Sequence, residues 1–177
     1  KGVEVEYTWL PTSWLTLSGA FAFLDSEFKE FRGTPCPNLG DVPRDANLPA
    51  LCDLTGFRNV KTPEWRMNHT ARVTFPLGGD TEWFAQGSSI FTDESYMTID
   101  HDSRGLQDSY SLIDLSAGIQ ATDGRWDVRV WARNVTDEKY IIFLGNPAVP
   151  GNFGVRGSKV VYLGAPATYG IRAAMNF

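Results

Sequence analysis

The sequence contains no long apolar run and no excess of positive charge. Its long stretches without a charged residue include Trp9–Leu24 and Tyr140–Val155, and both contain proline. Neither reaches the ~20 apolar residues that a membrane-spanning helix needs, so a helical membrane span is excluded. The 16 Lys and Arg residues are outnumbered by 21 Asp and Glu residues, which leaves a net charge of −5. A nucleic-acid surface needs clustered positive charge, and no nucleic-acid partner is therefore expected.

Residues that carry most enzyme chemistry are also scarce. The two histidines, His69 and His101, fall in different predicted elements, and no serine lies in a GxSxG turn. The glycine-rich residues 151–157 lack the Lys-Ser/Thr pair of a phosphate-binding loop. We therefore expect no catalytic residues, no metal site and no cofactor, and we expect that the protein is not an enzyme.

The two cysteines, Cys36 and Cys52, lie in one segment rich in proline, glycine, asparagine and aspartate. An even number of cysteines in a loop predicts a disulfide and an oxidising compartment, with two free thiols as the alternative. A metal site is disfavoured because there is no CxxC pair and no neighbouring histidine.

The start of the sequence shows no secretory signal. The first residue is Lys1, and no basic segment followed by an apolar one comes after it. We expect that the chain begins after processing or within a longer protein. Its 177 residues suit one domain.

Aromatic residues, in contrast, make up 13% of the sequence, and 17 residues are glycine. This mixture is typical of all-β proteins and of barrels that touch lipid. Apolar and polar residues alternate with a period of two along most of the chain, which predicts strands with one apolar and one polar face. The predicted strands are residues 2–10, 14–29, 63–76, 82–97, 109–121, 126–143 and 163–177.

The connections between these strands alternate in length. Residues 11–13, 76–80 and 122–125 are tight turns, and long connections lie near residues 30–62, 98–108 and 144–163. A soluble sandwich has no reason to place every short turn at one end, whereas outer-membrane barrels have short periplasmic turns and longer external loops.

The two faces of the strands differ in a way that suits a membrane barrel. The apolar face carries aromatic side chains beside the short turns and the C-terminus, which predicts a girdle at one membrane surface: Trp9, Trp14, Phe75, Trp83, Trp126 and Phe177. The polar face carries small and charged residues, which suits a wet lumen, and its charges are expected to pair with one another or to contact the plug or the substrate: Glu4, Glu6, Arg66, Arg72, Asp114, Arg129, Arg133 and Arg172.

The predicted fold is therefore all-β: a segment of an antiparallel transmembrane β-barrel with about seven strands. Single-chain bacterial barrels have an even number of strands, so seven strands predict a piece of a larger barrel. Alone, this piece would form an open, curved sheet with two unpaired edges, which lipid does not tolerate.

Four motifs in order resemble the TonB-dependent outer-membrane receptors. Residues 1–6 (KGVEVE) resemble their "kGvEle" strand, and residues 14–19 (WLTLSG) resemble the strand that follows it. Arg125 and Trp126 with residues 134–140 (NVTDEKY) resemble the "N-L-[TF]-D-x-x-Y" signature of the penultimate strand. Residues 164–177 resemble the last strand, with Ala167 in place of the usual Arg.

The resemblance covers essentially the whole chain and implies the C-terminal part, residues 1–177, of a 22-stranded barrel whose N-terminal plug is absent. It implies a location in the bacterial outer membrane, in contact with lipid, with the rest of the barrel and with the plug. It also implies active uptake of a scarce ligand driven by the TonB complex through the absent N-terminal part. A ferric siderophore is the default ligand, and cobalamin and oligosaccharides are the family's other substrates.

Further roles are expected for individual residues. Tyr169, Gly170 and Phe177 resemble the C-terminal signal that the barrel assembly machinery reads. Asp100, His101 and Asp102 lie in an acidic loop and are candidates for contact with a ligand or a cation, although a solvated loop is the simpler interpretation.

Several residues break the alternation, among them Phe84 and Ile90, which fall on the opposite face from Trp83 and Phe91. His69 falls on the lipid face, where we expect it to be neutral or displaced inward by a bulge. Trp131 is an apolar residue on the polar face, where it could pack on the plug.

Two other classes of protein remain open at this point. One is a small stand-alone outer-membrane barrel or pore. The other is a soluble β-sandwich, for example a carbohydrate-binding module, which would bury Val73, Leu115, Val128 and Ile171 in a compact nucleus.

Overall fold

Seven long antiparallel strands form one sheet in the computed structural model, which describes residues 1–36, 42–99, 101, 103–145 and 159–176. Their spatial order is the order of the chain, so that each strand pairs with the next long strand. The strands are β1 (Gly2–Thr12), β2 (Leu15–Leu24), β5 (Trp65–Gly78), β6 (Thr81–Thr92), β9 (Tyr110–Ala121), β10 (Trp126–Arg133) and β13 (Thr168–Met175).

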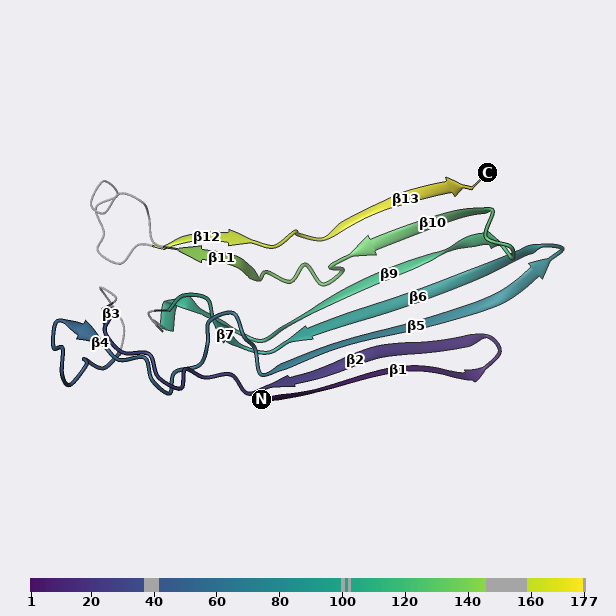
Figure 1. The fold of residues 1–177 in the computed structure, drawn as a ribbon. Coiled ribbons are helices and arrows are strands. Elements are labelled where there is room, and N and C mark those ends of the chain that lie inside the picture. Colours follow the sequence, from purple (N-terminus) through teal and green to yellow (C-terminus); the bar gives the residue numbers. More distant parts are fainter. Residues whose placement is uncertain (37–41, 100, 102, 146–158, 177) are drawn as a thin grey trace.

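The strands lie side by side in a curved sheet with tight turns at one end and long connections at the other (Figure 1). The β5–β6 turn places Gly78 and Gly79 at positive φ (116° and 59°), and the β9–β10 turn does the same with Gly124 (75°). Glycine adopts this backbone conformation without the steric penalty of a Cβ atom. The predicted alternation of short and long connections is confirmed.

The sheet does not close on itself. Strands β1 and β13 are its two edges, and within the described residues neither edge pairs with the other. This confirms the open, all-antiparallel sheet and contradicts a complete small barrel formed by the described strands.

The apolar face of the sheet is not sealed by a second layer. Leu115, Val128 and Ile171 are 50%, 41% and 76% exposed. Phe84 is the large side chain that the sheet buries completely, and it lies on the opposite face. A soluble sandwich is therefore contradicted, because it would enclose these apolar side chains.

Four predicted strands extended too far. The strands predicted over 14–29 and 82–97 end at Leu24 and Thr92. The strand predicted over 126–143 ends at Arg133, since Asn134 and Asp137 have positive φ angles of 48° and 52°. The strand predicted over 163–177 begins only at Thr168, two residues after Pro166, because proline donates no hydrogen bond to a ladder. The intervening segments form a separate hairpin of β11 (Ile141–Gly145) and β12 (Val160–Leu163).

The other long connections also contain short strands that are separate from the main sheet. Strands β3 (Thr34–Pro35) and β4 (Leu51–Cys52) pair in the first connection. Strands β7 (Ser95–Tyr96) and β8 (Leu106–Gln107) pair in the second, with a 3₁₀ turn at Ser103–Gly105. No helix in the described part of the chain is long and apolar enough to cross a membrane.

Candidate functional site

The register of the sheet assigns every side chain to one of two faces. On the apolar face, Val5, Phe21, Met67 and Phe91 form one continuous cross-strand row. The charges that were predicted to line the lumen all lie on the opposite face, which we call the lumen wall: Glu4, Glu6, Arg66, Arg72, Asp114, Arg129, Arg133 and Arg172.

Five of the six predicted girdle residues gather at the turn end of the apolar face. Trp14, Phe75 and Trp83 stack in sequence, with ring centroids 5.3 and 5.1 Å apart. Trp9 and Trp126 lie at the same end of their strands and on the same face. Phe177 lies outside the described residues.

A second aromatic group lies at the loop end of the apolar face. Trp65 contacts Phe21 and Phe23, with ring centroids 5.0 and 4.5 Å apart. On β5, Trp65 and Phe75 are ten residues apart, which corresponds to roughly 26 Å along the membrane normal at ~3.4 Å per residue and a tilt of about 40°. Two aromatic levels at this spacing match the ~25 Å apolar band of outer-membrane barrels.

His69 lies on the apolar face between these two levels. The ladder of β5 is regular through His69, so no bulge displaces it inward, and that alternative is wrong. Its Nδ1 lies 3.0 Å from the Tyr7 hydroxyl oxygen, on the far side of β2. Gly19 lies between them, and a Cβ there would approach Nδ1 to 2.8 Å. The missing side chain of Gly19 thus lets two polar groups satisfy each other on a lipid-facing surface.

The centre of the lumen wall is an arginine–aromatic cluster around Phe84. The guanidinium of Arg72 lies 4.0 Å from the centre of the Phe84 ring, and that of Arg129 lies 5.4 Å from it. Arg72 also donates to the side-chain oxygens of Gln86 (3.2 Å) and Gln120 (2.7 Å). Gln120 in turn donates to Glu82 at 2.5 Å. The cluster satisfies its own polar groups within four strands.

The lumen charges therefore pair differently from the prediction. Arg129 makes an ion pair with Asp127 at 2.7 Å, but Asp127 was not among the predicted residues. Arg72 binds two amides, and the Arg133 guanidinium lies 5.2 Å from the ring of Trp131. The expectation that the predicted charges pair with one another is wrong for these arginines. Amides take the place of carboxylates at Arg72, and an aromatic face does so at Arg133, whereas Arg129 keeps a carboxylate partner.

Two hollows flank the cluster on the lumen wall. One, of about 210 Å³, is bordered by Arg129, Trp131, Arg133 and Arg172. Trp131 does not stand out into the lumen, because its indole lies over Gly170, where a Cβ would approach the ring to 2.7 Å. The structure therefore places Trp131 against its own wall.

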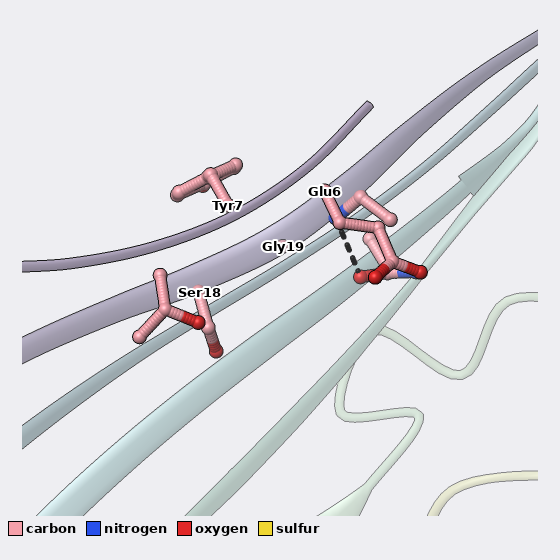
Figure 2. Close-up of a pocket in the computed structure, with 7 residues that line it drawn as sticks. Glu6, Tyr7, Ser18 and Gly19 are labelled. Atoms are coloured by element: carbon pink, nitrogen blue, oxygen red, sulfur yellow. Dashed lines mark hydrogen bonds between the residues drawn. The ribbon is translucent and has the colours of Figure 1, made fainter. Parts of the chain in front are cut away.

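The other hollow is an open bay of about 440 Å³ on β1 and β2, lined by small polar side chains and Glu6. Figure 2 shows Glu6 and Ser18 on one side of the two strands and Tyr7 on the other. The Asn68 side chain is held against β2, since its Oδ1 accepts a hydrogen bond from the Ala20 amide at 3.0 Å. The bay gives the lumen a surface without bulky side chains at this edge of the sheet.

The first external connection folds into a ribbon closed by a disulfide. Cys36 and Cys52 are bonded, and Cys52 and Leu54 are almost completely buried. The Phe28 and Gly56 amides donate to the carbonyls of Phe57 and Phe28 at 2.9 and 2.8 Å. The ribbon thus has its own ladder and its own small core.

Loss of the disulfide should loosen this ribbon. In the Cys36→Ser/Cys52→Ser double variant we expect a loss of about 3 kcal/mol of local stability, from the entropy of the reopened loop of 16 residues. Limited trypsin digestion of whole cells should then cut at Arg44, while the barrel strands stay intact. Equal resistance of variant and parent would contradict a stabilising role.

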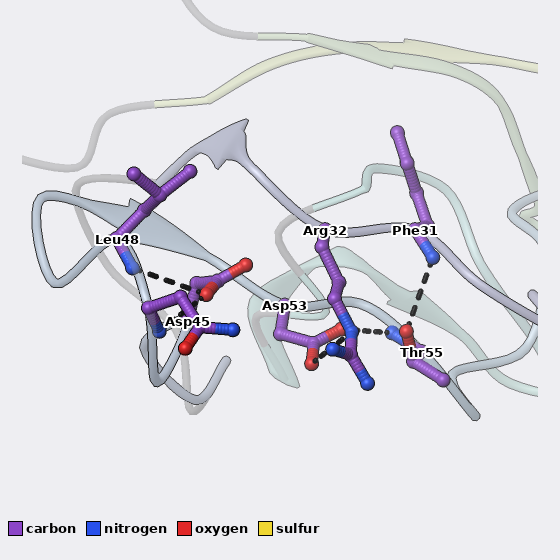
Figure 3. A network of polar contacts seen from close by, with 7 residues as sticks. Phe31, Arg32, Asp45, Leu48, Asp53 and Thr55 are labelled. Carbon is purple, nitrogen blue, oxygen red and sulfur yellow. Dashed lines mark hydrogen bonds and ion pairs between the residues drawn. The ribbon is translucent and has the colours of Figure 1, made fainter.

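A polar network holds the far part of the ribbon (Figure 3). Asp45 accepts from the amides of Asn47 and Leu48 at 2.8 and 3.1 Å. Asp53 accepts from the Thr55 amide at 2.9 Å and lies 3.5 Å from Arg32. The hydrogen bonds from Thr55, together with the charge of Arg32, lower the pKa of Asp53 below its usual value of 3.8.

This network makes the ribbon sensitive to acid. Because the folded pKa of Asp53 is the lower one, the charged carboxylate stabilises the ribbon above the unfolded pKa, and this contribution is lost as the pH falls through the folded pKa. Pepsin cleavage in the ribbon, normalised to an unstructured substrate at each pH, should rise below about pH 4. The Asp53→Asn variant lacks this carboxylate, so its normalised cleavage rate should be the same above and below about pH 4. A variant that keeps the parent's pH profile would rule out this carboxylate.

The external connections also contact one another. The Lys61 amide donates to the Tyr96 carbonyl at 2.8 Å, and the Ile141 amide donates to the Gln107 side chain at 2.5 Å. His101 packs between the rings of Phe57 (4.8 Å) and Tyr96 (4.5 Å). These contacts join all three connections into one layer at the loop end of the sheet.

Of the predicted ligand-contact residues, only His101 can be placed. Asp100 and Asp102 lie outside the described residues. No group of three His, Cys, Asp or Glu side chains within the described ranges is arranged to hold a metal ion. His101 has a positive φ of 47° and serves in the packing between the first and second connections.

The sequence model of a family described as TonB dependent receptor-like, beta-barrel matches residues 1–135. The chain belongs to this family. It is therefore part of a bacterial outer-membrane β-barrel, which agrees with the two aromatic levels on its apolar face. A search of curated protein sequences gives no match.

Solved structures share the fold of this TonB-dependent receptor segment. The ferric yersiniabactin uptake receptor FyuA from Yersinia pestis superposes on 99% of the chain with a TM-score of 0.70 and 19% identity. BauA, the ferric preacinetobactin receptor from Acinetobacter baumannii, gives 0.63 and 18% over 97% of the chain, and FpvAI in its complex with pyocin S2 gives 0.56 and 16% over 97%. The chain spans about a fifth of these structures (23%, 21% and 18%).

The signature residues of the TonB-dependent receptor segment have a structural role that the sequence did not reveal. Asn134 is 5% exposed, and its Nδ2 donates to the carbonyls of Glu138 (2.9 Å) and Ala165 (3.0 Å). Its Oδ1 accepts from the Glu138 amide at 2.9 Å, and its own amide donates to Asp114 at 2.9 Å. Asp137 accepts from the Ala167 amide at 2.9 Å. The motif therefore joins β9, β10 and the start of β13.

The last strand of this receptor segment shows where two of the three predicted assembly-signal residues lie. Tyr169 is 85% exposed on the apolar face, and Gly170 lies beneath the indole of Trp131 on the lumen wall. Phe177 is outside the described residues. Gly170 thus has a packing reason to be glycine, independent of any recognition signal.

Proposed function

We propose that the complete protein is an outer-membrane receptor that takes up a ferric siderophore in a TonB-dependent manner. In this proposal, the chain supplies the C-terminal strands, part of the lumen wall and three external connections. The remaining strands would pair with the edges β1 and β13, and a plug would fill the lumen and transmit the pull of TonB. The protein would be a transporter without catalytic residues, and the barrel assembly machinery would insert it through its last strand.

The observation that carries this proposal is the open sheet with one lipid face and one charged lumen face. A seven-stranded sheet with two unpaired edges needs further strands to exist in lipid. Two of the similar structures are named as receptors for ferric ligands, yersiniabactin and preacinetobactin. At this low sequence identity, the similarity supports a shared fold. The assignment of a ferric siderophore as the ligand of this protein is our proposal.

Growth under iron limitation tests the proposal. The full-length gene, expressed in a host that lacks its own siderophore receptors, should restore growth on one or more members of a panel of ferric siderophores. A matched host without TonB should not grow, because uptake against a gradient needs the energised complex. Restored growth without TonB would indicate a passive pore, and binding of no ferric ligand by the purified receptor would overturn the siderophore assignment.

A further inference from the structure

The hollow beside Trp131 concentrates positive charge on the lumen wall. Arg129 and Arg172 are direct partners across β10 and β13, and Arg133 lies four residues further along β10 on the same face. All three arginines border the hollow of about 210 Å³. Like charges that face each other across a strand pair are destabilising unless something compensates them.

The described residues compensate only part of this charge. Asp127 pairs with Arg129 at 2.7 Å, and one oxygen of Asp114, which also lines the hollow, accepts from the Asn134 amide at 2.9 Å. No ion pair to Arg133 or Arg172 is found within the described ranges of the chain. The neighbouring cluster at Arg72 differs, because two glutamine side chains satisfy that guanidinium.

The shape of the hollow adds a second constraint. The indole of Trp131 is held flat by Gly170, where a Cβ would come within 2.7 Å of the ring. The hollow therefore has guanidinium groups on its sides and an aromatic surface between them. Guanidinium groups bind carboxylates and phosphates through paired N–H donors, and the carboxylate is the planar one of the two.

We propose that Arg133 and Arg172, together with Trp131, form a carboxylate-binding site on the lumen wall. The carboxylate can come from a side chain of the segment that fills the barrel or from a ligand in transit. The second source rests on the proposed uptake function, whereas the first does not. In both cases the site holds one oxyanion between β10 and β13.

Arginine modification in the purified full-length receptor tests the site. Each arginine is treated with p-hydroxyphenylglyoxal, and its rate of modification is measured by mass spectrometry relative to the denatured receptor. Arg44 is the control, because its side chain is exposed on the external ribbon and makes no ion pair within the described residues. Charge-assisted hydrogen bonds from a bound carboxylate should slow modification of Arg133 and Arg172 about tenfold or more relative to Arg44.

The result separates the two sources. Protection without any addition indicates an internal carboxylate, and the Arg133→Gln/Arg172→Gln variant should then melt at a lower temperature, with partial rescue by lysine at both positions. Protection that appears only when citrate is added indicates a ligand carboxylate. Arginines that react as fast as Arg44 with and without citrate would overturn the proposal. Protection without citrate combined with an unchanged melting temperature in the double variant would overturn it as well. None of these readouts depends on uptake activity.

Discussion

Replacing Asn134 with alanine should destabilise the full-length receptor by about 3–5 kcal/mol. The substitution removes three side-chain hydrogen bonds, to the amide and carbonyl of Glu138 and to the carbonyl of Ala165. It also places alanine at a positive φ of 48°, a conformation that asparagine tolerates better. Urea unfolding of the detergent-solubilised receptor measures the loss.

Two further variants separate the causes. Asn134→Gly keeps the backbone relaxed and loses only the hydrogen bonds, so it should be about 1 kcal/mol more stable than the alanine variant. Asn176→Ala is the matched control, because this exposed side chain makes one hydrogen bond, to the Gly124 carbonyl at 3.0 Å. It should change stability by about 0.5 kcal/mol or less. Equal effects at positions 134 and 176 would show that the signature motif does not join the strands.

An arginine at position 71 should destabilise the folded barrel by about 2–4 kcal/mol, the cost of a charge near the middle of the lipid face. Ala71 is exposed and lies in the apolar row with Leu17 and Gly87, between the two aromatic levels. The neighbouring Thr70 lies on the lumen wall between Ser18 and Ser88.

The matched Thr70→Arg variant should therefore cost less than about 1 kcal/mol. The two variants are compared by the temperature at which the folded barrel unfolds on semi-native gels. The amount inserted into the outer membrane is a second readout. A larger loss for Thr70→Arg than for Ala71→Arg would reverse the assignment of the faces.

The sheet could be predicted from the sequence because one physical constraint dominates it. A wall one residue thick, with hydrocarbon on one side and water on the other, forces an alternation with period two through every strand. Val3, Val5 and Ile171 carry this signal without any help from tertiary contacts. Turn chemistry at Gly78, Gly79 and Gly124 fixes the tight connections locally.

The strand ends and the loops could not be predicted in the same way. The sequence predicts a strand that runs beyond Arg133 to residue 143, but the positive φ of Asn134 and the hydrogen bonds of its side chain end the strand. Those partners, such as Ala165, are distant in sequence. The ladders of the external connections are short, and their pairing depends on contacts such as that of Lys61 with Tyr96.

The sequence predicted which side chains lie on the lumen wall, but it did not predict which groups they contact. Alternation places Arg72 and Arg129 on the wall, yet only the register shows that both lie against the Phe84 ring. Phe84, Gln86 and Gln120 were missed, because an apolar residue on a polar face and two neutral amides give no charge signal. The sequence shows that Phe84 and Ile90 break the alternation of β6, but it does not reveal the role of Phe84.

The orientation of the sheet in the membrane is the central claim, and nitroxide scanning of β2 tests it most directly. In the full-length receptor in lipid, spin labels at Leu15, Leu17 and Phe21 should relax fastest with dissolved oxygen. Labels at Thr16, Ser18 and Ala20 should relax fastest with a water-soluble nickel chelate, which gives a period of two. Accessibility without alternation, or with oxygen maxima on the serine side, would contradict a sheet whose apolar face touches acyl chains.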